Sequence, residues 1–263
     1  MSDDSVLLHA SPEGVATVTL NRPEVHNAFD AEVIERLRDI FADLAGADGV
    51  RAVLLKAAGK SFSAGADLNW MRHAAGFSEQ ENREDARALG EMMRRLDTLP
   101  KPTVALVQGA AFGGGVGLVA ACDIAVAVSD AAFSLSEVKL GLVPAVVSPY
   151  VIAAIGARQA RRYFLTGERF DAGEARRIGL VHEVVADAEA LAAAGERIVE
   201  RLFTAAPGAI ADAKELISAV AGRPIDAHLI DDTARRIAER RTHHEAREGV
   251  AAFLEKRKPN WRE

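Results

Sequence analysis

Two segments of the 263-residue sequence could hold an anion through backbone N–H groups. Residues 63–67 read SAGAD, and their small side chains would let a ligand approach the main chain closely. Residues 109–117 read GAAFGGGVG and lead into a predicted helix, whose first N–H groups are unpaired and whose dipole attracts negative charge. Taken alone, each segment is also typical of a tight turn or of close helix packing, so an oxyanion site needs further support.

The second segment does not fit the common phosphate-binding motifs. Gly113, Gly114 and Gly115 are consecutive and position 118 is leucine, which breaks the G-x-G-x-x-G pattern of dinucleotide-binding folds. The segment also lacks the Gly-Lys-Ser/Thr end of a P-loop.

A candidate acid/base, Glu137, ends the run FSLSE at residues 133–137. A carboxylate that faces an apolar pocket can have a raised pKa, which suits proton transfer near neutral pH. Most glutamates are solvated surface residues, so the catalytic role of Glu137 depends on the wider pattern.

Alternating and apolar runs predict the elements that would position these residues. Strands are predicted at residues 15–20, 52–55, 103–107 and 124–128. Asp30 is expected to cap the helix after the first strand, and Ser78 with Glu81 has the spacing of a capping box for a polar helix that reaches about Leu99. The alternation of strands and helices indicates an α/β fold with crossover connections.

The chain becomes mainly helical after Pro144, where Asp171 with Glu174 is expected to cap one helix. Further helices are predicted near residues 188–203, 207–220, 226–240 and 245–256. No linker or repeat interrupts the sequence. The simplest division is a core at residues 1–200 and a helical C-terminal region at residues 201–263.

Composition excludes several classes of protein. The 38 acidic and 32 basic residues give a net charge of −6, which disfavours sequence-independent nucleic-acid binding. Residues 1–5 lack the pattern of a signal peptide. The most apolar run, residues 103–128, is interrupted by five glycines and by Asp123, so no membrane span is predicted. The single cysteine, Cys122, is expected to be a buried core residue. A cytoplasmic setting is therefore the default prediction.

Taken together, these segments resemble the enoyl-CoA hydratase/isomerase, or crotonase, family. The matching stretches lie in order along nearly the whole chain: NRPEVHNAF (21–29), FSAGADLNWM (62–71), VQGAAFGGGVGLVAACDIAVA (107–127), SEVKLGLVP (136–144), LTGERFDAGEARRIGLVHEVV (165–185) and AFLEKRKPNW (252–261). The resemblance implies a crotonase-like spiral core of ββα turns. It also implies that the helical C-terminal region forms a homotrimer, often within a dimer of trimers.

The resemblance also implies residue roles. The backbone N–H groups of Ala66 and Gly114 would polarise the thioester carbonyl of an acyl-CoA, and Glu137 would be the catalytic acid/base. Contacts with CoA carry over to Val25, His26, Ala64, Asp67, Leu68, Phe253 and Lys256. The run KRK at residues 256–258 would supply local positive charge for the polyanionic CoA, which enters as part of the substrate. Neither a permanently bound cofactor nor a metal is expected.

One departure from the family concerns the mechanism. Hydratases of this family commonly have a first glutamate at the position of Gly117, so hydration by two carboxylates is in doubt here. Glu137 could both activate the water and transfer the proton. Alternatively, the reaction could be isomerisation by a single base, or another group could take the place of the first carboxylate. A non-catalytic acyl-CoA-binding protein is a third reading, although the retained Glu137 argues against it.

A second departure follows Pro144. The chain continues AVVSPY at residues 145–150, where many relatives have a glycine-rich loop, and the added side chains should reshape the acyl pocket. This run is most similar to bacterial methylglutaconyl-CoA and isohexenylglutaconyl-CoA hydratases. The leading prediction is therefore an enoyl-CoA hydratase for a branched, glutaconyl-type ester, with an enoyl-CoA isomerase as the alternative.

Overall fold

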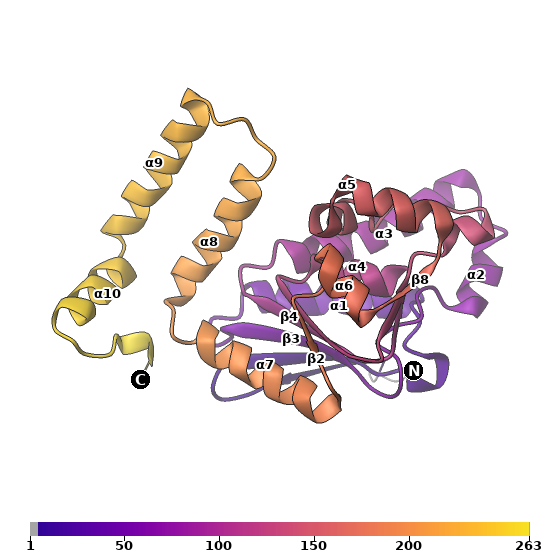
Figure 1. Ribbon diagram of the computed structural model, residues 1–263, viewed down its shortest axis with the longest axis horizontal. Coiled ribbons are helices and arrows are strands. Elements are labelled where there is room, and N and C mark those ends of the chain that lie inside the picture. Colours follow the sequence, from indigo (N-terminus) through magenta and orange to yellow (C-terminus); the bar gives the residue numbers. More distant parts are fainter. Residues whose placement is uncertain (1–4, 263) are drawn as a thin grey trace.

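A six-stranded sheet lies at the centre of the fold (Figure 1), in a computed structural model that describes residues 5–262. The predicted lack of a signal peptide concerns mainly residues 1–4, which lie outside the described residues. The strand order is β1-β2-β3-β4-β6-β9. The strands are β1 (Val6–Ala10), β2 (Val15–Leu20), β3 (Ala52–Ala57), β4 (Thr103–Val107), β6 (Ile124–Val128) and β9 (Glu183–Val185).

Only the β1–β2 pair is antiparallel, and the other pairs in this sheet are parallel. The predicted crossover connections are therefore confirmed. Every residue of β4 is buried, as expected for a central parallel strand covered on both faces. β2 alternates between buried and half-buried residues, which matches its sequence pattern.

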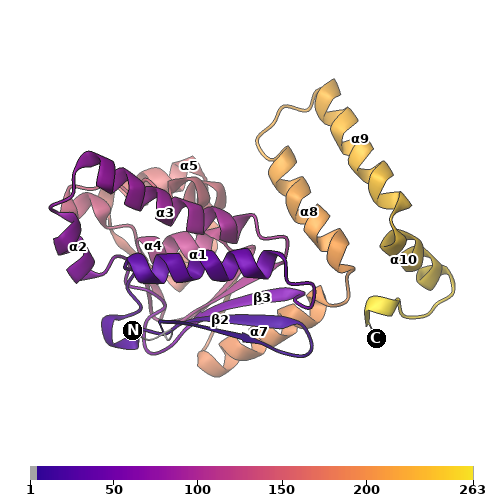
Figure 2. The same cartoon turned by 180° about the vertical axis from the view of Figure 1, so that it is seen from behind.

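Helices cover both faces of this sheet (Figure 2). The first face carries α1 (Ala31–Ala45), α2 (Leu68–Ala74), α3 (Glu79–Asp97) and α4 (Gly114–Ala121), and the opposite face carries α7 (Ala188–Leu202). The predicted cap at Asp30 is confirmed, because its Oδ1 accepts a hydrogen bond from Val33 N at 2.9 Å. The capping box of Ser78 and Glu81 is confirmed as well.

A second, three-stranded sheet was not predicted from the sequence. It comprises β5 (Ala110–Phe112), β7 (Ala132–Ser134) and β8 (Arg169–Asp171), in the order β5-β7-β8. Strands of three residues are too short to show a clear alternation of polar and apolar positions. The small sheet matters for function because its first two strands lead into candidate site residues.

The chain winds through the two sheets in successive strand–strand–helix turns. β4 enters the large sheet, β5 enters the small sheet and α4 follows them; β6 and β7 repeat this path. The elements after β7 are η2 (Glu137–Leu140), α5 (Ser148–Thr166) and α6 (Ala172–Ile178). This winding is the predicted ββα spiral.

The C-terminal helices form an arm that extends away from the core (Figure 1). The arm comprises α8 (Pro207–Val220), α9 (Ala227–Thr242), α10 (His244–Leu254) and η3 (Asn260–Arg262), which confirms the predicted helices to within two residues at each end. Lys214 Nζ in α8 pairs with Asp123 at 2.8 Å, and Arg51 donates to Trp261 O at 3.0 Å. Both ends of the arm are therefore attached to the core.

Three further predictions can be compared with the described residues. No helix within residues 5–262 has the length and apolar character needed to cross a bilayer. In the same part of the chain, no group of three or more His, Cys, Asp or Glu side chains could hold a metal ion. Cys122 is buried, as predicted, and burial raises the pKa of its thiol to about 12.

Candidate active site

The two loops proposed as oxyanion donors lie beside each other because their main chains are paired. Ser63 N donates to Ala110 O at 3.0 Å, and Phe112 N donates to Ser63 O at 2.8 Å. These bonds form a parallel bridge between Ser63 and Ala111. Each segment then continues for three residues, one to Ala66 and the other to Gly114. The pairing therefore delivers the two candidate donors side by side.

The N–H groups of Ala66 and Gly114 donate no hydrogen bond within the described part of the chain. Phe29 bridges to Ala66 through the groups on either side of it: Phe29 N donates to Gly65 O at 2.7 Å, and Asp67 N donates to Phe29 O at 2.8 Å. Gly114 is the first residue of α4, so its N–H has no acceptor within the helix. Both amides are consequently available to a ligand.

The ring of Phe29 explains why Gly114 has no side chain. A Cβ atom at Gly114 would lie 2.7 Å from Phe29 Cε2, well inside van der Waals contact. Phe29 is itself buried and is fixed by its bridge to Ala66. One aromatic residue thus supports both donor positions.

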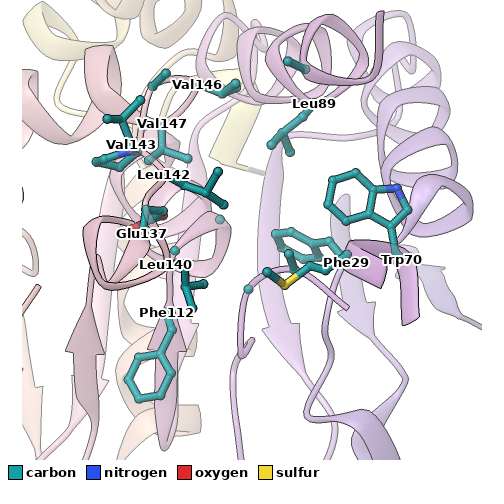
Figure 3. Close-up of a pocket in the computed structure, with 18 of the residues that line it drawn as sticks. Phe29, Trp70, Leu89, Phe112, Glu137, Leu140, Leu142, Val143, Val146 and Val147 are labelled. Carbon is teal, nitrogen blue, oxygen red and sulfur yellow. The ribbon is translucent and has the colours of Figure 1, made fainter. Parts of the chain in front are cut away.

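Both donors line a cavity of about 650 Å³, which Figure 3 shows in close-up. Phe29, Trp70 and Leu89 lie on one side of it, and facing them are Glu137, Leu140, Leu142, Val143, Val146 and Val147. The lining is predominantly apolar, and a volume of this size suits a small-molecule acyl group.

Glu137 is the first residue of η2 and lies beside the donor pair. Gly113 N donates to Ser134 O at 2.9 Å, which holds the end of β7 against the start of α4. A Cβ atom at Gly113 would be 3.1 Å from Glu137 Oε1. The other carboxylate oxygen, Oε2, is buried and has no hydrogen-bond partner among residues 5–262.

Burial raises the pKa of Glu137 above its ordinary value, although a hydrogen bond from its own backbone acts in the opposite direction. A buried oxygen without a partner is costly in a folded protein, and such atoms often mark a functional site. The carboxyl group of Glu137 is therefore a candidate for proton transfer, and its catalytic role stays a prediction.

The space around Gly117 is filled rather than empty. A Cβ atom at this position would lie 2.9 Å from Met93 Cε and 2.9 Å from Val147 Cβ, and the Cγ1 of Val147 would be closer still. Met93 and Val147 are both buried. An apolar contact therefore occupies the place where a first carboxylate would begin. Val147 belongs to the run 145–150, whose Ala145 and Val146 also line the cavity, and the reshaping of the pocket relative to other family members stays a prediction.

Some of the predicted CoA-contacting residues lie next to the donor loop. Ala64 and Leu68 line the cavity. His26 follows η1 (Pro23–Val25), and its carbonyl accepts a hydrogen bond from Ala64 N at 2.9 Å. The exposed imidazole lies 3.0 Å from Ser61 Oγ through Nδ1. Val25, His26 and Ala64 are thus brought together, and their contacts with CoA stay predictions.

Asp67 has a visible structural role. Its Oδ1 caps α2 by accepting hydrogen bonds from Asn69 N at 2.8 Å and Trp70 N at 3.1 Å. Its Oδ2 pairs with Arg22 at 3.3 Å. These contacts hold the start of a short helix, and a contact between Asp67 and CoA stays a prediction.

Phe253 and Lys256 lie apart from the other predicted site residues. Phe253 is in α10 and Lys256 follows that helix, so both belong to the C-terminal arm and neither lines the cavity (Figure 1). The side chain of Phe253 is 82% exposed. A single chain therefore does not bring these two residues to its own site.

One polar pair in the cavity wall, Asp85 and Trp70, was not predicted from the sequence. Both residues line the cavity, and the Trp70 side chain lies near enough to the Asp85 carboxyl group to favour its ionised form. Burial raises the pKa of Asp85. A signal was present in the sequence, because Asp85 is four residues before Leu89 and eight before Met93 and therefore lies on the inward stripe of α3.

Comparison with known proteins identifies relatives over almost the whole chain. The family model described as Enoyl-CoA hydratase/isomerase matches residues 10–263. The chain is 38% identical over 251 residues to the enoyl-CoA hydratase AKT6-1 of Alternaria alternata, covering 93% of this chain and 80% of that protein. It is 33% identical over 246 residues to the short-chain-enoyl-CoA hydratase of Clostridium acetobutylicum, covering 93% and 92% of the two chains.

The fold has close counterparts among solved structures. The crystal structure of an enoyl-CoA hydratase from Shewanella pealeana superposes with a TM-score of 0.94 at 45% identity. The match covers 98% of this chain and 96% of that one. The spiral core and the C-terminal helical arm are therefore both part of the shared fold.

Proposed function

The chain belongs to the enoyl-CoA hydratase/isomerase family, and from this premise we propose that it adds water across the conjugated double bond of an enoyl-CoA. The observation that carries the proposal is the buried carboxyl group of Glu137, whose Oε2 lacks a partner beside two unpaired backbone N–H groups. This arrangement matches a reaction that transfers a proton and places negative charge on a carbonyl oxygen.

The two backbone donors stabilise the charge that develops on the substrate. The thioester oxygen accepts hydrogen bonds from the N–H groups of Ala66 and Gly114, and attack of water on the β-carbon moves negative charge onto that oxygen. A preorganised donor of this kind contributes about 3–4 kcal/mol to the transition state. The amino-terminal end of α4 adds a favourable dipole.

Glu137 serves as both base and acid in a one-carboxylate cycle. Its carboxylate takes a proton from water as the water oxygen bonds to the β-carbon, which produces an enolate and a carboxylic acid. The α-carbon of the enolate then takes that proton, and Glu137 returns to its ionised form. The cycle needs no group at position 117, where Val147 and Met93 fill the space.

A branched, glutaconyl-type ester is the proposed substrate. The run from Ser136 to Tyr150 resembles hydratases of such esters, and Leu140, Leu142 and Val143 line a cavity able to hold a branched chain. The same cavity lacks lysine, arginine and histidine among its described lining residues, so the distal carboxyl group must be bound by other means.

Incubation with 3-methylglutaconyl-CoA and with crotonyl-CoA tests the proposal. We expect loss of the conjugated enoyl absorbance, faster with the branched ester, and incorporation of oxygen from ¹⁸O-labelled water. Absence of turnover with both esters, despite tight binding of CoA esters, would refute the proposed hydration and favour a non-catalytic binding protein.

Isomerisation is the alternative reaction, favoured by the apolar contact between Gly117 and Val147. In this case Glu137 moves a proton between two carbons of the acyl chain and no water is added. Labelled water separates the reactions, because a shifted double bond without ¹⁸O in the product would establish isomerisation.

The arm supports a homotrimer or a dimer of trimers. Its large exposed apolar side chains are Leu216, Ile217, Ile225, Ile230, Ile237, Val250, Phe253 and Leu254. A second copy that covers this surface would also bring Phe253 and Lys256 to a neighbouring cavity, as the CoA-contact prediction requires. Sedimentation velocity tests the proposal, and a monomer at micromolar concentration would contradict it.

A further inference from the structure

The acyl cavity contains a second carboxyl group besides Glu137. Asp85 and Glu137 are the only titratable side chains among the described residues that line it. The two groups belong to different walls: Asp85 lies one turn before Leu89 on α3, and Figure 3 shows Leu89 and Trp70 across the cavity from Glu137. Asp85 is therefore placed to meet a part of the acyl group other than the reacting carbons.

The position of Asp85 is fixed by two helices. Its own helix, α3, packs against α1 and α4. The neighbouring Trp70 belongs to α2, whose start is held by the cap at Asp67, including a bond from Trp70 N at 3.1 Å. Packing of the two helices therefore holds the half-buried carboxyl group at the cavity wall, where it can meet a ligand.

The surroundings of Asp85 limit what it can bind. The opposing segment 140–147 contributes Leu140, Leu142, Val143 and Val146, none of which can donate a side-chain hydrogen bond. The one titratable group that faces Asp85 from another element is Glu137, on η2. The amide of Asn82, which also lines the cavity, already donates to Phe77 O and Ser78 O. A polar group of the ligand is therefore the donor that the Asp85 carboxyl group can meet inside the cavity.

We propose that Asp85, on the α3 wall of the cavity, is a specificity-determining residue that accepts a hydrogen bond from the distal polar end of the acyl group. The inference rests on the proposed hydration of an enoyl-CoA. The ligand class is an acyl chain that ends in an uncharged donor, such as a carboxamide, a hydroxyl group or a protonated carboxyl group.

The proposed role of Asp85 determines how the distal carboxyl group of a glutaconyl-type ester would bind. Its distal carboxyl group meets the carboxyl group of Asp85 with no lysine, arginine or histidine among the described lining residues. Two carboxylates in contact repel each other, so the pair binds by sharing one proton. Use of such an ester therefore declines as pH rises and the shared proton is lost.

Three enoyl-CoA esters of equal length test the proposal, with a methyl, a carboxamide or a carboxyl group at the distal end. For the wild type we expect a kcat/KM at least about 10-fold higher for the carboxamide than for the methyl ester, the effect of one hydrogen bond to a charged group. Asp85→Leu should bring this ratio to about 1 while changing the methyl ester by only a few-fold. Asp85→Asn, which can also donate, should increase use of the carboxyl ester at pH 8.

Glu84→Leu is the matched control, because Glu84 is exposed on the same helix and does not line the cavity. It should leave all three ratios unchanged. Equal kcat/KM for the methyl and carboxamide esters in the wild type, or an unchanged ratio in Asp85→Leu, would overturn the role of Asp85.

Failure of this inference can be told apart from failure of the proposed function. If no ester is hydrated by the wild type, hydration itself is refuted. The inference can then still be decided by the Kd values of the three esters, measured calorimetrically with the wild type and Asp85→Leu. A preference for the carboxamide that disappears in Asp85→Leu supports the inference, and identical Kd patterns in the two proteins overturn it.

Discussion

Two positions flank the pair of backbone donors, and the chain fills them in opposite ways. At Glu137 a carboxyl group is buried with one oxygen unsatisfied, which is costly for the fold and useful for proton transfer. At Gly117 the side chain is absent, and the space is closed by Val147 and Met93. The first position is organised for chemistry and the second for packing.

The difference shows that position 117 is closed by packing and not left as a cavity. Val147, in the segment just before α5, fills the space that a side chain at this position would need. The proposed reaction therefore depends on the Glu137 side alone, and the following predictions test that asymmetry.

Replacing Glu137 should have the largest effect. Glu137→Gln keeps the shape of the side chain but cannot take up a proton, so we expect kcat to fall about 10²–10⁴-fold with little change in the Kd for CoA esters. Steady-state kinetics and calorimetry would measure the two quantities. An unchanged rate would remove the distinction between the two flanking positions.

The second largest effect on kcat is expected from changing Gly114, one of the two backbone donors. Gly114→Ala places a methyl group against the ring of Phe29 and displaces the N–H from its position. We expect a loss of about 10²–10³-fold in kcat, the scale of one lost oxyanion donor. The double variant Gly114→Ala with Phe29→Leu should recover part of the rate if the ring contact is the cause, and no recovery would contradict this explanation.

The packing around Gly117 can be tested by introducing a carboxylate at that position. Gly117→Glu overpacks against Val147 and Met93, so we expect it to lower the free energy of unfolding by about 1–3 kcal/mol without raising activity. Adding Val147→Gly should return part of this stability in urea titrations. Normal stability of the single variant would show that position 117 is less tightly filled than the structure indicates.

The smallest expected effect concerns pH. Burial raises the pKa of Glu137, and the carboxylate form takes the proton from water, so kcat/KM should fall as pH decreases through a pKa above the ordinary glutamate value. A raised pKa in the folded state also means that any stability from this group is lost as pH rises through that pKa. Glu137→Gln should therefore be at least as heat-stable as the wild type at pH 8, and a lower melting temperature would contradict this.

The sequence predicted those parts of the molecule that depend on local pattern or on long matching motifs. The strands at residues 15–20 and 103–107 and the capping box at Ser78 follow from side-chain periodicity and capping chemistry. The prediction that Ala66 and Gly114 lie at one site came from the family resemblance, because no local pattern links two loops so distant in the chain.

Features made by contacts between distant residues could not be predicted. The filling of the space at Gly117 depends on Val147, 30 positions further along the chain, and on the path of the segment before α5. The closeness of Trp70 to Asp85 in the cavity wall likewise depends on the angle between two helices. Small strands such as β5 were missed because tertiary pairing, and not propensity, defines them.

The bridge between Ser63 and Ala111 makes the oxyanion site sensitive to chain length as well as to side-chain size. Each donor lies three residues beyond this bridge, and an extended residue spans about 3.3 Å. Inserting or deleting one residue within 64–66 or 112–114 would shift one donor past the other by more than a hydrogen bond tolerates. Over evolutionary time these two short segments should exclude insertions and deletions as strictly as Gly114 excludes a side chain, whereas the exposed connection between α8 and α9 is free to vary in length.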